Sequence, residues 1–339
     1  MVPTVRGSSA DDGDSVTEVG TQSAALILGP VDERERLAIA DGFEADGWLS
    51  TIGQLVVDHP DTNNQSMFGH CTGTLIGPDV GGHHATHVLT AAHCATEQMQ
   101  ALAQYFVPRR NGAALLSVDY NVEQPGAPFG YFKSSMNVPS AALPPEYMSL
   151  GCDAPGGYDE RCLIHDWAVL SYDMTPPPAS SGPLPDGLAT STRWFMLLNA
   201  FSAAELETGK TWKLRGYPAC GDLNSPAPCQ SDYLYGNTKA ACNIVPATGV
   251  STGILDPMIL PTDRVLASID CDVSPGHSGG PMYDYFSGRP TIAGVVIAHC
   301  DEHPENVYCT LGQHLPNWMR RVESGMLNTI YSAFPILDQ

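Results

Sequence analysis

The chain has 339 residues and a formal charge of −21 at pH 7, because 37 acidic residues outnumber 16 lysines and arginines. That balance argues against a nucleic-acid partner, which would need a basic face for the phosphates, and favours solubility and long-range attraction of cationic molecules. The length allows a full hydrophobic core, and the 33 glycines and 28 prolines are typical of short strands joined by turns.

The N-terminal residues 1–25 are rich in Ser, Asp, Gly and Thr. We interpret them as a flexible leader or pro-segment, with an expression remnant as the alternative. The apolar run at 24–28 is too short for the core of a signal peptide, and no basic cluster precedes it. No segment is predicted to span a membrane.

The first motif with chemical content covers residues 90–94, Thr-Ala-Ala-His-Cys, at the end of an apolar run. An imidazole takes up a proton near pH 7 and returns it later, so His93 is a candidate general base and acid. His83, His84 and His87 lie just upstream, in or beside an apparent insertion between two strands. We interpret them as part of a hairpin loop and expect no metal and no other cofactor.

The next apolar run begins at residues 166–170, Asp-Trp-Ala-Val-Leu. A buried carboxylate on the far nitrogen of His93 would fix its tautomer and stabilise the imidazolium, so Asp166 is the candidate orienting acid. His165 is adjacent, but neighbours on a strand point to opposite faces, so His165 and Asp166 cannot both enter one site.

A serine enclosed by glycines follows at residues 274–281, Ser-Pro-Gly-His-Ser-Gly-Gly-Pro. The glycines expose Ser278 on a tight turn as a candidate nucleophile, and let backbone N–H groups approach a substrate carbonyl. The N–H groups of Gly276 and Ser278 are the candidate oxyanion hole. Taken alone, the motif fits both the nucleophile elbow of α/β-hydrolases and the G-x-S-G-G-P turn of trypsin-like proteases.

The order of the motifs separates these two classes. An α/β-hydrolase places its acid and histidine after the serine, whereas His93 and Asp166 precede Ser278. Only 61 residues follow Ser278 (339 − 278), and the Gly-Gly-Pro sequence breaks the helix that an elbow requires. Residues 290–297 predict a buried strand instead.

The last predicted element is a helix over 316–331. Trp318, Val322, Met326 and Ile330 fall on one helical face at a spacing of four residues. We expect this face to pack on the β structure formed by the C-terminal half of the chain.

Over about residues 30–325, the chain resembles the trypsin/chymotrypsin-like serine protease family. The resemblance rests on the motifs around His93 and Ser278, and on Cys-Thr-Gly-Thr-Leu-Ile-Gly-Pro at 71–78, Gly-Tyr-Pro at 216–218 and Asn-Val-Tyr at 306–308. It is strongest to the bacterial glutamyl-endopeptidase-like branch, whose mature chains open much like residues 27–34. The resemblance implies an all-β fold of two six-stranded antiparallel β-barrels with a C-terminal helix.

The resemblance also implies a domain organisation and a function. Residues 26–185 would form the N-terminal barrel with His93 and Asp166, and residues 186–339 the C-terminal barrel with Ser278 and the helix. The chain would be a monomeric serine endopeptidase that hydrolyses protein or peptide substrates through an acyl-enzyme. The alternatives are a catalytically inactive protease-like binding protein and an esterase.

Ten cysteines indicate an oxidising compartment, so we expect a secreted or extracellular protein. The resemblance implies a Cys71–Cys94 bridge around the histidine motif. Neighbour order suggests four further pairs, although sequence alone leaves the connectivity open: Cys152–Cys162, Cys220–Cys229, Cys242–Cys271 and Cys300–Cys309.

Two residues are candidates for substrate selection. Asp272 precedes Ser278 by six positions, where the resemblance implies the floor of the primary pocket, and a carboxylate there would select Lys or Arg by charge-assisted hydrogen bonds. His299 ends the strand on the opposite wall, and glutamyl endopeptidases use a histidine on this wall to bind an acidic side chain. A preference for Lys or Arg is the prediction, and glutamate specificity is the alternative.

The residue before the nucleophile departs from the family pattern. Trypsin-like enzymes carry an aspartate there, which pairs with the new N-terminus after activation, whereas this chain has His277. A neutral histidine cannot form that ion pair. The N–H groups of Gly276 and Ser278 must therefore be ordered by other contacts, and we interpret His277 as a packing residue.

Overall fold

The computed structural model describes residues 34–36, 51–58, 68–77, 87–100, 103–108, 132–133, 140–154, 160–171, 196–207, 211–217, 235–237, 242–246, 264–268, 271, 273, 276–298 and 317–338. Within these ranges, no helix is long and apolar enough to cross a membrane.

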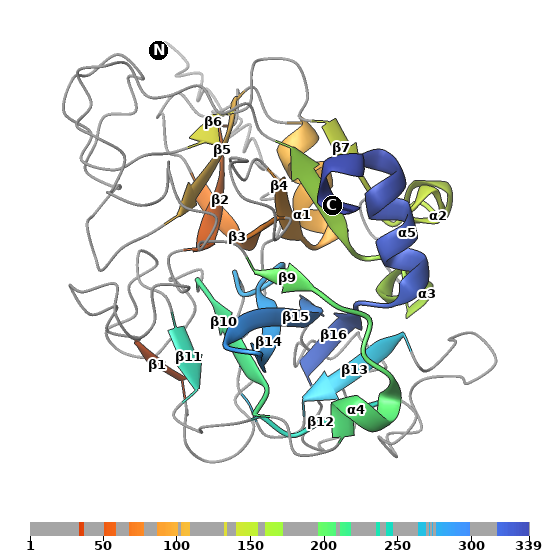
Figure 1. The fold of residues 1–339 in the computed structure, drawn as a ribbon. Helices are drawn as coiled ribbons and strands as arrows, with labels where there is room; N and C mark the ends of the chain where they lie inside the picture. The colour runs from red at the N-terminus through yellow and green to blue at the C-terminus, as the bar shows by residue number, and fades with distance from the viewer. Residues whose placement is uncertain are drawn as a thin grey trace, which may run out of the picture.

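The first sheet has seven antiparallel strands in the order β6-β5-β2-β3-β4-β8-β7 (Figure 1). In chain order, they are β2 (Ile52–Asp58), β3 (Phe68–Ile76), β4 (His87–Thr90), β5 (Ala103–Pro108), β6 (Phe132–Lys133), β7 (Ser140–Ala142) and β8 (Ala168–Ser171). The strands β4 and β8 lie inside the sheet and are short and rich in β-branched and apolar residues, which suits strands covered on both faces. All four residues of β4 are buried.

The second sheet has nine strands, eight of them in the order β1-β11-β10-β14-β15-β16-β13-β12. They are β1 (Arg34–Arg36), β10 (Lys213–Gly216), β11 (Tyr235–Asn237), β12 (Ile244–Pro246), β13 (Val265–Ser268), β14 (Pro281–Phe286), β15 (Arg289–Ala298) and β16 (Asn317–Arg321). The ninth, β9 (Leu197–Leu198), pairs with β15 in parallel, whereas the other pairs are antiparallel.

Two antiparallel sheets with few helices confirm the predicted all-β fold class. The described strands number seven and nine, instead of six in each half, partly because short strands extend the second sheet. β1 pairs with β11, which lies about 200 residues later in the chain, and β9 is added beside β15. A three-residue strand such as β1 carries too little hydrophobic pattern to be predicted from its own sequence.

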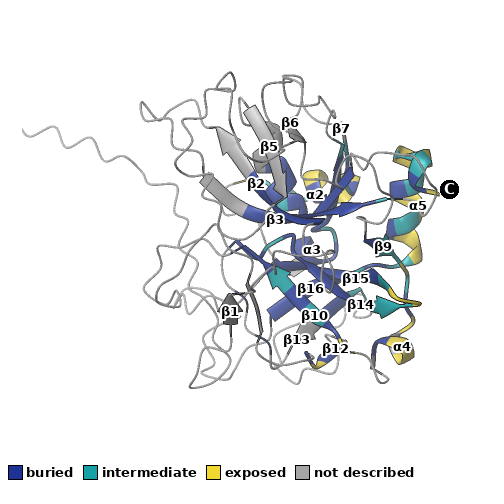
Figure 2. Ribbon diagram, turned by 60° about the vertical axis from the view of Figure 1, so that its left-hand side comes forward, coloured by how far each residue is buried: buried dark blue, intermediate teal, exposed yellow. Residues whose placement is uncertain are grey.

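The helices are short and lie around the sheets, as Figure 1 shows. They are α1 (Ala92–Gln100), α2 (Pro145–Ser149), α3 (Glu160–Leu163), α4 (Ala203–Glu207), α5 (Ser324–Ala333) and the 3₁₀ helix η5 (Pro335–Asp338). In Figure 2, exposed residues gather on α2, α4 and α5, while the described parts of both sheets are mainly buried.

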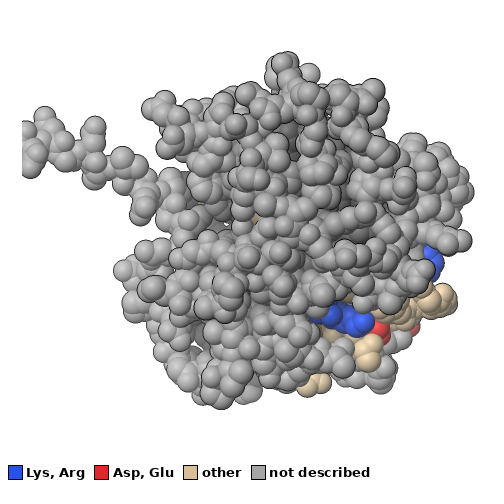
Figure 3. Space-filling model, turned by 90° about the vertical axis from the view of Figure 1, so that its left-hand side faces the viewer, with Lys and Arg blue, Asp and Glu red and all other residues tan. Residues whose placement is uncertain are grey.

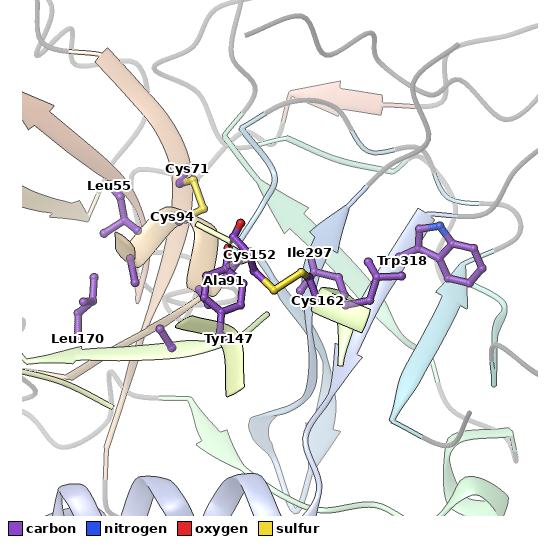
Figure 4. Packing of buried hydrophobic residues seen from close by; sticks show 14 of the residues in the cluster. Leu55, Cys71, Ala91, Cys94, Tyr147, Cys152, Cys162, Leu170, Ile297 and Trp318 are labelled. Carbon is purple, nitrogen blue, oxygen red and sulfur yellow. Dashed lines mark hydrogen bonds between the residues drawn. A yellow bond between two sulfur atoms is a disulfide. The ribbon is translucent and has the colours of Figure 1, made fainter. Parts of the chain in front are cut away.

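The two sheets share hydrophobic clusters. One cluster joins Leu55 and Tyr147 of the first half with Ile297 and Trp318 of the second, and includes the Cys152–Cys162 disulfide (Figure 4). Apolar burial of this kind is the main favourable contribution to folding, at about 25 cal/mol per Å² removed from water. The seam between the sheets is therefore part of the core.

The C-terminal segment differs from the predicted single helix over 316–331. Residues 317–321 form β16, which pairs with both β15 and β13, and α5 begins only at Ser324. Trp318 lies opposite Ala267 and Ala298 in the sheet. The pairing of β16 with β15 and β13 outweighs the helical preference suggested by the four-residue spacing. A strand between two neighbours has hydrogen-bond partners for its backbone N–H and C=O groups on both edges.

The position of α5 also differs from the prediction. Its buried residues Met326 and Ile330 join a cluster that contains Ile52 and Leu89 of the first sheet, and α5 contacts β7. The terminal helix therefore packs across the seam against the first sheet, rather than on the second alone (Figure 1).

Glu323 is the N-cap of α5. Its carboxylate accepts hydrogen bonds from Gly325 N at 2.7 Å and Met326 N at 3.1 Å. Burial favours a raised pKa for Glu323, but the Gly325 N–H and the Arg320 guanidinium outweigh it, so the pKa lies below its usual value. This cap stabilises the helix start, since the first N–H groups of a helix have no partner within it.

His87 on β4 gives a testable pH dependence. It is buried, its ring lies 4.7 Å from that of Phe334, and burial lowers the pKa of His87 to about 4. Because the unfolded chain binds a proton near pH 6.5 and the folded protein does not, stability should fall between about pH 6.5 and pH 4, by about 3 kcal/mol at most.

We expect His87→Leu to remove this part of the acid dependence, because leucine does not titrate and keeps an apolar contact with Phe334. Urea unfolding of both proteins at pH 7 and pH 5 measures it. If both proteins lose the same stability between pH 7 and pH 5, the titration of His87 does not cause this acid dependence.

On the face drawn in Figure 3, the described residues occupy a small area near the lower right, where basic and acidic side chains lie next to each other. The described part of this face is thus mixed in charge, although the whole chain is strongly acidic.

Candidate active site

His93 lies in the first turn of α1, directly after β4. Ala91 and Ala92 are fully buried, so the helix start is fixed against the core, while the His93 side chain keeps 33% exposure. Small residues before the histidine let the helix approach the sheet closely, and leave the imidazole at the surface of the seam.

Asp166 lies between α3 and β8 and is fully buried. Its Oδ2 lies 2.8 Å from His93 Nδ1, and its Oδ1 accepts from the His93 backbone N–H at 3.0 Å. Because a carboxylate only accepts, this pairing places the ring proton on Nδ1 and leaves the lone pair on Nε2. An imidazole held in this way is set up to take a proton from a nucleophile at Nε2.

The disulfide Cys152–Cys162 and Tyr147 surround the segment before Asp166. Burial, followed by the negative charges of Asp166 and Asp153, raises the pKa of Tyr147 and keeps its hydroxyl protonated. The Tyr147 hydroxyl donates to Cys152 O at 3.5 Å. A neutral tyrosine and a disulfide thus pack with Leu163 and Ile164, just before Asp166, without adding charge.

Ser278 lies in a turn over residues 276–280, just before β14, which we call the nucleophile turn. Gly279 has φ +84°, and a Cβ there would lie 2.1 Å from Thr72 O. Only glycine fits this position, since a side chain would meet the backbone of β3. The turn is therefore pressed against the first sheet.

Three carbonyl groups of the nucleophile turn are fixed by hydrogen bonds. Gly276 O accepts from Thr72 Oγ1 at 2.6 Å, His277 O from Gly280 N at 2.7 Å, and Ser278 O from Thr72 N at 2.8 Å. Within the described part of the chain, neither the Gly276 N–H nor the Ser278 N–H donates a hydrogen bond. These two donors suit an oxyanion.

The Cys71–Cys94 disulfide links β3 to α1 and lies beside the nucleophile turn. Cys94 Sγ lies 3.7 Å from Ser278 O, so the residue after His93 contacts the serine backbone. His93 offers a nitrogen within 4.8 Å of both sulfur atoms. The sulfurs are bonded to each other, so this group does not provide thiolates for a metal.

His277 is buried with its ring against Gly216 of β10. A Cβ at position 216 would lie 2.6 Å from His277 Cδ2, so Gly216 makes the space that the imidazole fills. This placement agrees with a packing role for His277.

His165 lies next to Asp166. Burial and the positive charges of Arg320 and Arg264 lower the pKa of His165, and they outweigh the negative charge of Glu146, which raises it.

Several predicted residues lie outside the described residues. They are Asp272, His299 and the predicted pairs Cys220–Cys229 and Cys300–Cys309. The predicted bridges Cys71–Cys94, Cys152–Cys162 and Cys242–Cys271 are confirmed.

Sequence reasoning missed Thr72, Thr90 and Tyr217 as part of the site. Thr72 bonds to the nucleophile turn, Thr90 Oγ1 donates to Thr72 O at 2.8 Å, and Tyr217 N donates to Thr72 Oγ1 at 2.9 Å. The Cys-Thr-Gly and Gly-Tyr-Pro strings marked these positions as part of a resemblance, but gave no contact between them.

No protein-family model and no curated protein matches the chain. Among solved structures, it is similar to a Glu endopeptidase in complex with MPD, at 15% identity and a TM-score of 0.49 over 91% of this chain and 99% of that one. It is also similar to protease Anisep from Arthrobacter nicotinovorans, at 16% identity and a TM-score of 0.49 over 88% and 98%. A third similar structure is the thermostable serine protease AL20 from an extremophilic microorganism. The identity is 16% and the TM-score is 0.46, over 84% of this chain and 96% of that one.

Proposed function

We propose that the chain is a serine endopeptidase with Ser278 as nucleophile, His93 as general base and acid, and Asp166 as the orienting carboxylate. The observation that carries the proposal is the pair of contacts from His93 Nδ1 and N to the fully buried Asp166. The nucleophile turn supports it, because the turn lies next to Cys94 and has two unengaged N–H groups within the described residues.

The proposed reaction has two halves. Ser278 Oγ attacks the carbonyl carbon of the substrate while His93 Nε2 takes its proton, and the carbonyl electrons move to the oxygen, which Gly276 N–H and Ser278 N–H receive. The intermediate expels the amine, which takes the proton from His93, and an acyl-enzyme remains. Water then repeats the sequence, and releases the acid and the free Ser278 hydroxyl.

The finer assignments remain proposals. Asp272 would select Lys or Arg at the cleaved position, and His299 would serve in the alternative, a glutamate-specific enzyme. The three disulfides support an oxidising compartment, in agreement with secretion. We also propose that the enzyme acts as a monomer on protein or peptide substrates, and that residues 26–185 and 186–339 form the two halves.

A fluorophosphonate reagent tests the nucleophile. We expect the intact protein to gain one label at Ser278, and Ser278→Ala to gain none, because only an activated hydroxyl attacks the reagent at a useful rate. Ser287→Gly is the matched control, since Ser287 is exposed in the turn between β14 and β15 and has φ +50°. Intact mass and peptide mapping measure the label.

Cleavage of a mixed peptide library tests the reaction and its specificity. Cuts after Lys or Arg that are lost in Asp272→Ser would support the basic pocket, whereas cuts after Glu would favour the alternative that uses His299. Labelling without peptide cleavage would favour an esterase. Absence of labelling in disulfide-intact protein would favour a catalytically inactive binding protein.

A further inference from the structure

We infer that Thr72 of β3 is a positioning residue whose buried hydroxyl holds the nucleophile turn in the geometry that receives the oxyanion. The inference rests on the proposed function and extends it to a residue of the opposite sheet. It also supplies the ordering contact that the sequence leaves open, since His277 stands where a trypsin-like aspartate would be.

The Thr72 hydroxyl makes two buried hydrogen bonds. Thr72 is 0% exposed; its Oγ1 donates to Gly276 O at 2.6 Å and accepts from Tyr217 N at 2.9 Å. A hydroxyl has one proton, so the bond to Gly276 O fixes the direction of the Thr72 O–H group. The Tyr217 N–H then donates to a lone pair of the same oxygen. Both partners belong to the second half of the chain.

The backbone of Thr72 adds two further connections. Its N–H donates to Ser278 O at 2.8 Å, and its carbonyl accepts from Thr90 Oγ1 at 2.8 Å. Thr90 ends β4, three residues before His93. One residue therefore links the segment that carries the histidine to the turn that carries the serine.

The contact at Gly276 bears directly on the oxyanion donors. Gly276 has φ +87°, so its peptide groups rotate with little steric resistance unless they are held. Fixing the carbonyl of Gly276 on Thr72 turns it away from the site. A freed carbonyl would rotate and disturb the neighbouring N–H groups, and a turned-in oxygen would repel the oxyanion.

Thr72→Val removes the hydroxyl with almost no change in volume. The variant keeps the backbone bond from residue 72 to Ser278 O, but leaves Gly276 O without its donor and Tyr217 N–H without its acceptor. We expect kcat to fall about 10- to 100-fold, with KM changed less than about threefold, because the loss acts on the transition state. Thr72→Ser should restore most of kcat.

Thr74→Val is the matched control. Thr74 lies two residues along the same strand and is also 0% exposed, but its Oγ1 has no hydrogen-bond partner among the residues that the structure describes. We expect its kcat to stay within about twofold of the wild-type value. The same substitution at the two positions thus separates loss of the hydroxyl's bonds from a general effect of valine in β3.

A peptide boronic acid distinguishes positioning from a purely structural role. Its tetrahedral adduct on serine places an oxygen in the oxyanion hole, so Thr72→Val should weaken its inhibition by about the factor lost in kcat. Binding of a product peptide, which has no tetrahedral oxygen, should change little. If Thr72→Val does not fold, Thr72→Ala and Thr72→Ser form a second pair that tests the hydroxyl.

The outcomes separate the two proposals. If the wild-type protein takes no fluorophosphonate label, the proposed function fails. If it is labelled, but Thr72→Val matches Thr74→Val in kcat and in boronate inhibition, the role of Thr72 is wrong and the proposed function stands. Equal weakening of boronate and product binding would also overturn the positioning role.

Discussion

Asp166→Asn should leave the protein folded and lower kcat by about 10⁴-fold. Asp166 is fully buried, and each of its oxygens meets a different N–H of His93: Oδ1 meets the backbone N–H and Oδ2 meets Nδ1. An asparagine has one oxygen and one NH₂ group, so it cannot accept both bonds.

The hydrogen bonds of the introduced asparagine then select the wrong histidine tautomer. If its oxygen stays on the backbone N–H of His93, its NH₂ group faces Nδ1, which must accept; the ring proton moves to Nε2. That nitrogen is the one that takes the serine proton, so the base is lost while the geometry remains.

Steady-state kinetics and the rate of fluorophosphonate labelling measure this effect, with circular dichroism to show that the fold is kept. Asp153→Asn is a useful control, since Asp153 is another acid that raises the pKa of Tyr147. We expect it to change kcat by less than about threefold. A kcat for Asp166→Asn within tenfold of the wild-type value would contradict the role assigned to Asp166.

The sequence predicted the pair His93 and Asp166 because each residue lies in a short, recognisable string next to an apolar strand. Their hydrogen bond spans 73 residues, and the order of the motifs was sufficient to propose it. Their catalytic roles, and that of Ser278, remain predictions for the experiments above. Of the three confirmed disulfides, Cys71–Cys94 was implied by the resemblance, whereas Cys152–Cys162 and Cys242–Cys271 were suggested by pairing each cysteine with the next one along the chain.

Thr72 could not be predicted in the same way. Its hydroxyl partners lie 204 and 145 residues away, and a threonine inside a strand has no local pattern that marks such contacts. Thr74 has the same residue type and burial but no described partner, so neither composition nor periodicity distinguishes the two. Only the packing of the two sheets does.

The predicted terminal helix failed at Trp318 for a related reason. Spacing of four residues describes a helical face, but all residues from Asn317 to Arg320 are buried, as expected of a strand whose sheet is covered on both faces. The helix begins where Glu323 supplies a cap to Gly325 and Met326. A glutamate is not a typical N-cap residue, so the sequence contains no clear signal for a helix start at this point.

Arg320→Met should be the most destabilising substitution among those considered, with a loss of about 2–4 kcal/mol from the lost hydrogen bonds. The Arg320 side chain is 2% exposed, and its guanidinium donates to Ile164 O at 2.6 Å, Arg264 O at 3.2 Å and Arg321 O. Ile164 lies two residues before Asp166. Methionine fills much of the space of the stem but removes these donors, including the buried bond to Ile164 O, while Arg264 O keeps its bond from Arg321 N.

Urea unfolding measures the loss, with Arg161→Met as a control. Arg161 is exposed on α3, so its substitution should change stability by less than about 0.5 kcal/mol. Arg320→Lys should recover only part of the stability, because a single ammonium cannot reproduce the planar set of donors. A loss for Arg320→Met below about 1 kcal/mol would contradict this account.

The carbonyl contacts, rather than the ion pair, should account for most of the loss. Arg320 also donates to Glu323 Oε1 at 3.0 Å, but the Glu323 side chain is 22% exposed, and a partly solvated pair contributes about 1 kcal/mol or less. Glu323→Gln keeps one oxygen, which can still accept from Met326 N and Arg320, but it loses the charge and the acceptor for Gly325 N. We still expect it to cost less than Arg320→Met. If the two substitutions cost the same, the ion pair dominates; if Arg320→Met costs far more, Arg320 acts mainly by tying β16 to the segment that carries Asp166.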